Sequence, residues 1–225
     1  MWKTLIGAFK KDNLYQQALA EACEMLETDG RMFEASVESL RRSDTADIAV
    51  DIYKLDKEIN RSERDVRKKV MTHLVVSGGT ELAHGLALIS VVIDIERIGD
   101  YTKNIYDLAR RHPARLNAGP LEPLLSEIES GIGDAFRDTI RAFKDNNEDL
   151  AREVMAEYKE EHSANCEEII DKVIEGGIDL SPEDAAAVAL YTRYLKRIGS
   201  HSRNISTSIV NPFHRIGYKE KAPKG

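Results

Sequence analysis

One eleven-residue segment is nearly repeated in this chain. IERIGDYTKNI is followed a hundred residues later by LKRIGSHSRNI. Both copies keep Arg-Ile-Gly and then Asn-Ile at the same offset, which indicates a duplicated structural unit. The first copy carries two carboxylates, Glu96 and Asp100. Because Lys196 and Ser200 stand in their places in the second copy, we expect the two units to share packing but not chemistry.

The glycine of each copy also constrains the fold. A glycine inside a helix costs up to about 1 kcal/mol relative to alanine. Gly99 and Gly199 therefore each need a local reason, such as close packing of a neighbouring helix.

The stretches around both copies have the apolar spacing of helices. From Ile48 to Leu74, apolar residues recur at three- and four-residue steps with one gap of seven after Ile59, which is the period of one helical face rather than the alternation of a strand. The six prolines lie at the edges of such stretches. The pattern predicts helices near residues 12–42, 44–76, 80–111, 120–145, 147–175 and 182–209.

The order of these helices repeats as well. A stretch rich in proline and glycine, residues 112–123, separates the first three helices from the last three, and the repeated segment lies in the third helix of each set. Amphipathic helices bury their apolar faces most economically against one another. We therefore predict an all-α, six-helix protein built from two tandem three-helix-bundle repeats, at residues 1–114 and 115–210, with a C-terminal tail at 211–225.

Composition and charge exclude several classes of protein. With 225 residues, 42% of them apolar, the chain can bury a sizeable core. Its net charge is −7 and its basic residues are interspersed with acids, which is unlike a nucleic-acid-binding surface. No apolar run approaches the roughly 20 residues that span a bilayer, and the N-terminus lacks a signal-peptide core. We expect a cytoplasmic protein that does not bind nucleic acid directly.

Acids occupy positions where the helical pattern predicts apolar side chains. Two of them lie four residues apart in the first copy of the repeated segment, and two more lie on the corresponding face of the second predicted helix. Acids crowded on a partly desolvated surface cost several kcal/mol each unless they are protonated, hydrogen-bonded or bound to a cation. Carboxylates suit Mg, Ca, Mn or iron, and zinc less often. The candidate metal ligands are Glu96, Asp100, Asp56 and Glu63.

The same acids could instead form ordinary ion pairs. Glu96 could pair with Arg97 or Lys103 of its own helix, or with one of the arginines of the second helix. The spacing alone does not decide between a metal site and ordinary ion pairs. A ferritin-like di-metal oxidase needs two Glu-x-x-His motifs, and the sequence has one, from Glu81 to His84. The chain also lacks Gly-rich phosphate loops, GxSxG and HExxH, so we expect no enzyme activity.

The longer segment DIERIGDYTKNI resembles the E(D)xxxD-containing signature of the PhoU family of phosphate-uptake regulators, and the resemblance extends over the whole chain. It implies a six-helix protein that binds iron or zinc clusters through such acids. It also implies a negative regulator of phosphate uptake and phosphate-starvation signalling, which connects a membrane phosphate ABC transporter with a sensor histidine kinase. The resemblance further implies a homodimer that is cytoplasmic or peripheral at the inner face of the membrane.

Carried over residue by residue, the resemblance assigns the motif to Glu96 and Asp100. It assigns the facing acids to Asp56 and Glu63, and Asn60 departs from the family pattern there. These residues give an expected metal site in the first repeat.

The second repeat departs outright, because Lys196 and Ser200 cannot bind a hard cation as carboxylates do. Glu160 and Glu167 parallel the acids of the second helix and could pair with Lys196. His201 is the one replacement ligand that the segment offers, although a lone histidine is more often a surface residue. We expect one metal site at most. The alternatives are a metal-free helical scaffold or interaction protein and, less favoured, a di-metal carboxylate enzyme.

Overall fold

A computed structural model describes residues 14–77, 81–112, 114–158 and 162–220. These residues form α-helices and two short 3₁₀ helices, and no β-strand occurs among them. The all-α prediction is therefore confirmed. The elements are α2 (Leu14–Arg41), α3 (Ile52–Val76), α4 (Leu82–Arg111), η1 (Gly119–Leu121), α5 (Glu122–Asp145), α6 (Glu148–Glu157), α7 (Ser163–Glu175), α8 (Pro182–Val210) and η3 (Phe213–Arg215).

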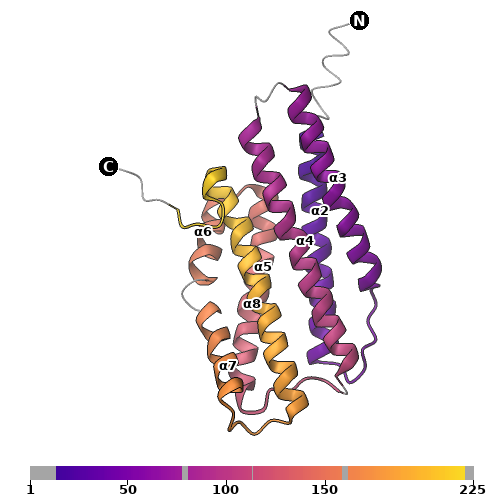
Figure 1. Cartoon of the computed structure of the whole chain (residues 1–225), viewed down its shortest axis with the longest axis vertical. Helices are drawn as coiled ribbons and strands as arrows, with labels where there is room; N and C mark the ends of the chain where they lie inside the picture. Colours follow the sequence, from indigo (N-terminus) through magenta and orange to yellow (C-terminus); the bar gives the residue numbers. More distant parts are fainter. Residues whose placement is uncertain (1–13, 78–80, 113, 159–161, 221–225) are drawn as a thin grey trace, which may run out of the picture.

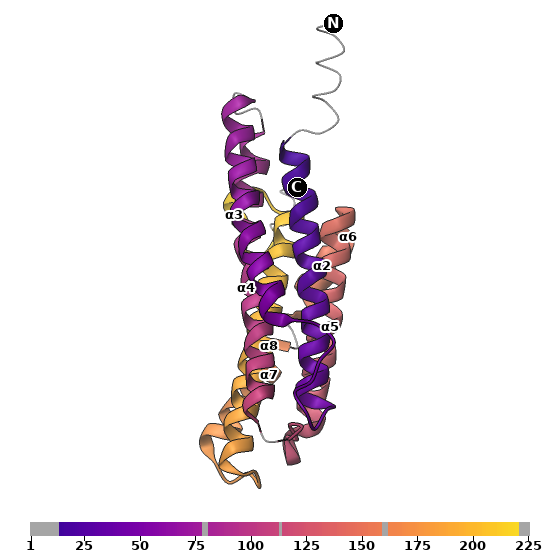
Figure 2. The ribbon, with the colours of Figure 1, turned by 90° about the vertical axis from the view of Figure 1, so that its right-hand side faces the viewer.

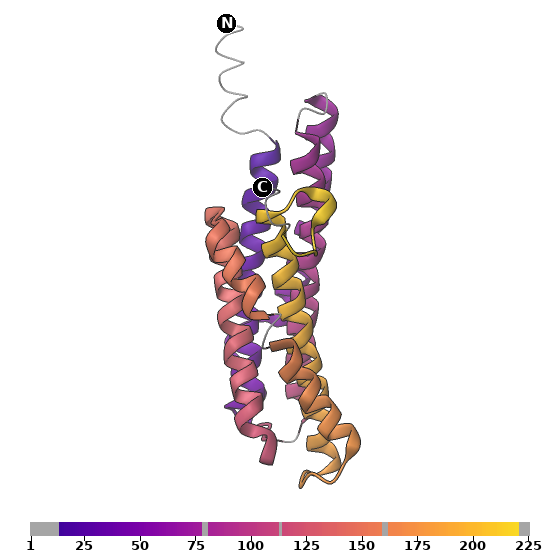
Figure 3. The same ribbon diagram turned by 90° about the vertical axis from the view of Figure 1, so that its left-hand side faces the viewer.

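The helices form two bundles that lie side by side in an elongated molecule (Figure 1). α2, α3 and α4 pack against one another, and α8 packs against α5, α6 and α7. The bundles meet where α4 packs against α8 and where α2 packs against α5. Figure 2 shows α2 beside α5, and Figure 3 shows α8 beside the helices of the first bundle. The tandem arrangement predicted from the repeated segment is confirmed.

The helix predicted at 147–175 is represented by two helices, α6 and α7. The backbone is π-helical at Tyr158 and His162, on either side of residues that lie outside the described part of the chain. The ring of His162 packs directly on α5, where a Cβ added to Gly131 would lie 2.2 Å from His162 Cε1. No proline or glycine lies between α6 and α7, so the sequence pattern did not reveal the division.

The helix predicted at 44–76 begins later, at Ile52. Asp51 ends the preceding segment and caps the helix, because its Oδ1 accepts a hydrogen bond of 3.0 Å from the backbone N–H of Lys54. Ile48 extends the apolar pattern towards the N-terminus, but it packs against the core from outside the helix. The predicted start was therefore wrong by about two turns.

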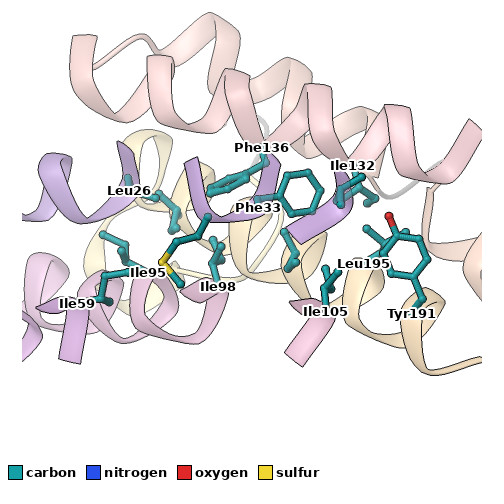
Figure 4. Packing of buried hydrophobic residues seen from close by; sticks show 14 of the residues in the cluster. Leu26, Phe33, Ile59, Ile95, Ile98, Ile105, Ile132, Phe136, Tyr191 and Leu195 are labelled. Atoms are coloured by element: carbon teal, nitrogen blue, oxygen red, sulfur yellow. The ribbon is translucent and has the colours of Figure 1, made fainter. Parts of the chain in front are cut away.

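A continuous apolar core fills both bundles (Figure 4). In the first bundle, Ile95 of α4 lies close to Leu26 of α2 and Ile59 of α3. Between the bundles, Phe33 of α2 meets Phe136 of α5 edge to face, with ring centroids 6.0 Å apart. The repeats therefore share a core across their interface.

Both motif glycines are buried at close helix contacts. A Cβ added to Gly199 would lie 2.5 Å from Ile132 Cδ1 and 2.5 Å from Tyr158 Cε2. A Cβ added to Gly99 would lie 2.7 Å from Asp29 Oδ1. Close packing is thus the local reason that the sequence required at both positions.

The segment after α8 turns back along the bundle. Asn211 Nδ2 donates a 2.8 Å hydrogen bond to the carbonyl of Tyr218, and the backbone N–H of Gly217 donates one of 2.7 Å to Thr207 Oγ1. η3 packs on α4 and α8. None of the helices in the described ranges has the length and apolarity needed to cross a membrane.

Candidate functional site

The predicted metal ligands lie on facing surfaces of α3 and α4 in the first repeat. Lys103 Nζ lies 2.8 Å from Asp56 Oδ1 and 3.3 Å from Asp100 Oδ1, so one ammonium group bridges the two helices. Arg97 lies 3.0 Å from the other oxygen of Asp100 and 3.5 Å from Glu96 Oε2. The structure therefore brings Asp56, Glu96 and Asp100 into one charge network.

Glu63 lies at the edge of this network, two helical turns beyond Asp56 on α3. It pairs with Arg67 of its own helix at 2.5 Å. The pKa of Glu96 is raised above its usual value, first by burial and then by Asp100, with further contributions from Glu63 and Asp56. Glu63 is thus coupled to Glu96 through space and held by its own arginine.

Asp29 of α2 is the acid that the sequence interpretation missed. Its side chain is fully buried, and neither carboxylate oxygen has a hydrogen-bond partner among the described residues. Burial raises its pKa well above the usual value, and Glu96, Asp56 and Asp100 raise that pKa further. Asp29 therefore forms the inner end of a four-acid cluster, which consists of Asp29, Asp56, Glu96 and Asp100.

A sequence signal for Asp29 does exist. It occupies the apolar stripe of α2, between the buried Met25 and Leu26 on one side and the buried Met32 and Phe33 on the other. An acid at such a position follows the same logic that singled out Glu96.

The four-acid cluster suits a hard cation by its chemistry, but its side chains are not arranged as a coordination shell. Within the described parts of the chain, no three His, Cys, Asp or Glu residues are grouped so as to hold a metal ion. The outer acids instead pair with Lys103 and Arg97, and of these contacts the ion-pair interpretation predicted the one between Glu96 and Arg97. Asp29 differs, because a buried ionised carboxylate without a partner costs several kcal/mol. It requires either a proton or a cation, and its raised pKa favours the proton in the folded chain.

The equivalent place in the second repeat is built differently. Lys196 pairs with Glu167 of α7, as expected from the sequence. Its backbone carbonyl accepts a 2.9 Å hydrogen bond from the Tyr158 hydroxyl, and the ring of Tyr158 packs on Gly199. Aromatic and aliphatic atoms thus fill the space that Asp29 occupies in the first repeat.

His201, the replacement ligand considered for the second repeat, is bound within the interface between the repeats. Its Nδ1 lies 2.7 Å from Asp94 Oδ1, and Asn204 Nδ2 donates to the same oxygen at 3.2 Å. The His201 ring stacks on Tyr101, with centroids 5.8 Å apart. These contacts join α8 to α4. Glu160 lies outside the described residues.

The Glu-x-x-His motif lies at the opposite end of α4 from the repeated segment. Glu81 Oε2 lies 2.7 Å from His73 Nε2 of α3. The motif therefore joins two helix ends, and it does not meet the four-acid cluster.

Comparison with known proteins identifies a family for both bundles. The family model described as PhoU domain matches the chain twice, at residues 22–109 and 125–209. Each match contains one copy of the repeated segment. The division into two units that the repeated segment indicated therefore recurs in the family comparison.

Two relatives that match most of this chain carry the same name. The chain is 27% identical over 209 residues to the phosphate-specific transport system accessory protein PhoU homolog of Xylella fastidiosa (strain Temecula1), which covers 88% of this chain and 83% of that protein. It is 30% identical over 173 residues to the protein of the same name from Pseudomonas putida, which covers 72% of this chain and 65% of that protein.

Two solved structures share the fold. The crystal structure of PhoU from Pseudomonas aeruginosa matches with a TM-score of 0.71 at 20% identity, over 90% of this chain and 97% of that chain. That of the phosphate transport system regulatory protein PhoU from Streptococcus pneumoniae matches with a TM-score of 0.66 at 18% identity, over 88% and 91%. At these identities the likeness concerns the fold alone.

Proposed function

The chain belongs to the PhoU family, and on this basis we propose that it is a negative regulator of phosphate uptake and of phosphate-starvation signalling. Two relatives that match most of the chain are named accessory proteins of the phosphate-specific transport system, which supports a transport system as its partner. In this proposal it acts without catalysis, as a homodimeric adaptor between a membrane phosphate ABC transporter and a sensor histidine kinase. Such an adaptor works in the cytoplasm, at the inner face of the membrane.

The proposed regulator holds iron or zinc in its first repeat. Glu96 and Asp100 of α4 and Asp56 of α3 would hold the ion, with Glu63 at the edge. A bound cation supplies the positive charge that crowded carboxylates need. The observation that supports this site is the convergence of the acids at partly buried positions, where the side chains of Glu96 and Asp56 are 13% and 14% exposed.

The protein's own cations set the conditions for this binding. Lys103 neutralises Asp56 and Asp100, and Arg97 neutralises Glu96 and Asp100. A metal ion must share these carboxylates with them or displace them. The site therefore favours a divalent or trivalent ion, whose higher charge outweighs a single ammonium or guanidinium group.

The same ion pairs support the alternative of a metal-free helical scaffold or interaction protein, because they already balance the outer acids. Metal analysis of the purified chain separates the two. The regulator proposal expects stoichiometric metal that is lost in Glu96→Ala and Asp100→Ala and kept in the control Asp65→Ala, which removes an exposed acid of α3. Wild-type protein that takes up no metal would favour the scaffold.

The regulatory role is tested in cells. Deleting the gene should derepress phosphate-uptake genes in phosphate-rich medium, and the wild-type chain should restore their repression. Continued repression in the deletion strain would rule out this role. The less favoured di-metal oxidase is abandoned if iron-loaded protein consumes no oxygen.

A further inference from the structure

The outer side of α3 carries a row of exposed residues. Six residues spaced three or four apart lie on this side, opposite the buried Ile59, Val66 and Val70. α3 packs against α2 and α4 at the edge of the molecule, so the row faces outwards (Figure 1). We call this row the outer face of α3, and it consists of Lys57, Arg61, Arg64, Lys68, Met71 and Val75.

The four cations of the outer face of α3 are not neutralised by the protein itself. No acid in the described ranges forms an ion pair with any of them. Two exposed acids, Glu58 and Asp65, border the face on one side, and the first pairs with Lys54 at 4.0 Å. A chain whose net charge is −7 thus presents a row of unpaired positive charges, which attracts an anionic partner.

The outer face of α3 continues into apolar side chains at the end of the helix. Met71 and Val75 are 60% and 78% exposed, and Val76 and Leu82 beside them are 80% and 51% exposed. We call these four residues the apolar end. The end of α3 and the start of α4 project beyond the other described helices (Figures 2 and 3). Glu81, the acid at the start of α4, is already paired with a histidine of α3.

We propose that the outer face of α3 binds a membrane surface that contains anionic lipids. Lipid phosphates are the counter-ions that the unpaired cations lack, and the apolar end enters the headgroup layer beside them. A peripheral protein needs both electrostatic attraction and buried apolar area, because one such signal alone binds weakly. This inference does not depend on the metal site or on the protein partners proposed above.

Two other occupants fit this surface less well. A second copy of the chain, related by a two-fold axis, would place one row of cations opposite the same row of its neighbour. An acidic protein would pair with the cations, but it would need a groove for the projecting apolar end, whereas a headgroup layer yields to it. A lipid surface satisfies the cations and the apolar end together.

Lipid binding through α3 would orient the whole molecule. α3 runs along the long axis, on the side of the first bundle that faces away from the second bundle (Figure 1). The outer face extends over about 27 Å of this helix. The chain would therefore lie lengthwise on the membrane and leave its second bundle free for protein partners.

The test is co-sedimentation of the full chain with lipid vesicles. Vesicles of phosphatidylcholine with about one-third phosphatidylglycerol should bind the wild type at low salt, and vesicles of phosphatidylcholine alone should bind it far more weakly. Each cation near an anionic surface contributes about fivefold in affinity, so the double variant Arg61→Gln, Arg64→Gln should bind about 25-fold more weakly. The control Arg137→Gln, Arg141→Gln removes the same charge from exposed positions of α5 and should bind as the wild type does.

The apolar end is tested separately. Val75→Ser with Val76→Ser should lower the affinity for the anionic vesicles at least about fivefold, because it removes apolar area that the lipid would bury. Both residues are exposed, so circular dichroism and the melting temperature of this variant should match those of the wild type.

Three outcomes would overturn the proposal. The first is a wild-type chain that does not sediment with the anionic vesicles but binds soluble polyglutamate, which would identify an acidic protein as the occupant, or binds neither. The second is equal vesicle binding by the α3 and α5 double variants. The third is a change of the α3 variants in oligomeric mass and not in vesicle binding, which would identify a second copy. None of these outcomes affects the regulatory role, which the deletion strain tests.

Discussion

The motif glycine of the second repeat allows a quantitative test of the packing. In Gly199→Ala, the new methyl group would lie 2.5 Å from Ile132 Cδ1 and 2.5 Å from Tyr158 Cε2. This is about 1 Å closer than non-bonded carbon atoms normally approach. Neither neighbour moves aside freely, because both are buried and the Tyr158 hydroxyl is hydrogen-bonded to the backbone of α8.

The expected magnitude follows from two opposing effects. Overpacking of this kind costs about 1–3 kcal/mol. Replacing glycine by alanine inside a helix returns about 1 kcal/mol. Gly199→Ala should therefore lower the free energy of unfolding by about 1 kcal/mol, and by no more than about 2 kcal/mol.

A matched glycine shows what the substitution does without the clash. A Cβ at Gly133 of α5 would lie 3.5 Å from Phe33 Cε1 and 3.6 Å from Arg137 Nη1, which are ordinary contacts. Gly133→Ala should therefore raise the free energy of unfolding by about 0.5–1 kcal/mol. Urea unfolding followed by circular dichroism, with chelator present, measures both variants. If Gly199→Ala proved as stable as Gly133→Ala, the close packing described at Gly199 would be wrong.

A double-mutant cycle locates the clash. Ile132→Val removes the Cδ1 atom that the new methyl group would meet, and by itself it should cost about 0.5–1.5 kcal/mol. In the presence of Gly199→Ala the cost should fall by at least about 0.5 kcal/mol, because the deletion relieves the overpacking. Strictly additive effects would show that Ile132 does not press on position 199.

Three further predictions concern other buried groups. Arg41→Ala should lower the free energy of unfolding in urea by about 3 kcal/mol, because it leaves the nearly buried Glu129 without its closest cation. A loss below about 1 kcal/mol would show that this ion pair contributes no more than a surface pair does. Burial raises the pKa of Cys166 to about 12, so at pH 8 only about 10⁻⁴ of this thiol is ionised. Ellman's reagent should therefore react with one thiol, that of Cys23, in the folded chain and with two after unfolding. In chelator, Asp29→Asn should be more stable than wild type at pH 7 and lose that advantage towards pH 4. Burial and then the neighbouring acids raise the pKa of Asp29 in the folded state. The wild type therefore loses up to about 1.4 kcal/mol of stability per pH unit as the pH rises above the pKa of the unfolded state. A stability difference between the two proteins that did not change with pH would show that Asp29 is not in such an environment.

The fold was predictable because several features of the sequence pointed to the same arrangement. The repeated segment indicated duplication, the apolar period indicated helices, and Gly99 and Gly199 indicated close contacts, all of which the structure contains. The later start of α3 was not predictable from the period, because Ile48 packs on the core without being helical. The division between α6 and α7 was hidden for a related reason. No proline or glycine marks the end of α6 or the start of α7.

The candidate site was predictable only in its outer part. Glu96 and Asp100 stand out because the second repeat lacks both acids, and helical spacing places Asp56 opposite them. Asp29 offers no such comparison, and only three-dimensional packing places it against Gly99. The sequence named Lys103 as a partner for Glu96, and the structure shows it bridging Asp56 and Asp100 instead. Spacing along one helix does not determine which neighbouring helix a long side chain reaches.

The central claim, that acids of the first repeat together hold a metal ion, is tested most directly by diffraction. Crystals of the chain loaded with zinc or iron should be measured on both sides of the metal's absorption edge. We predict an anomalous peak among Asp56, Glu63, Glu96 and Asp100, and none beside Lys196. A map without a peak among these four acids, or with its main peak in the second repeat, would contradict the claim.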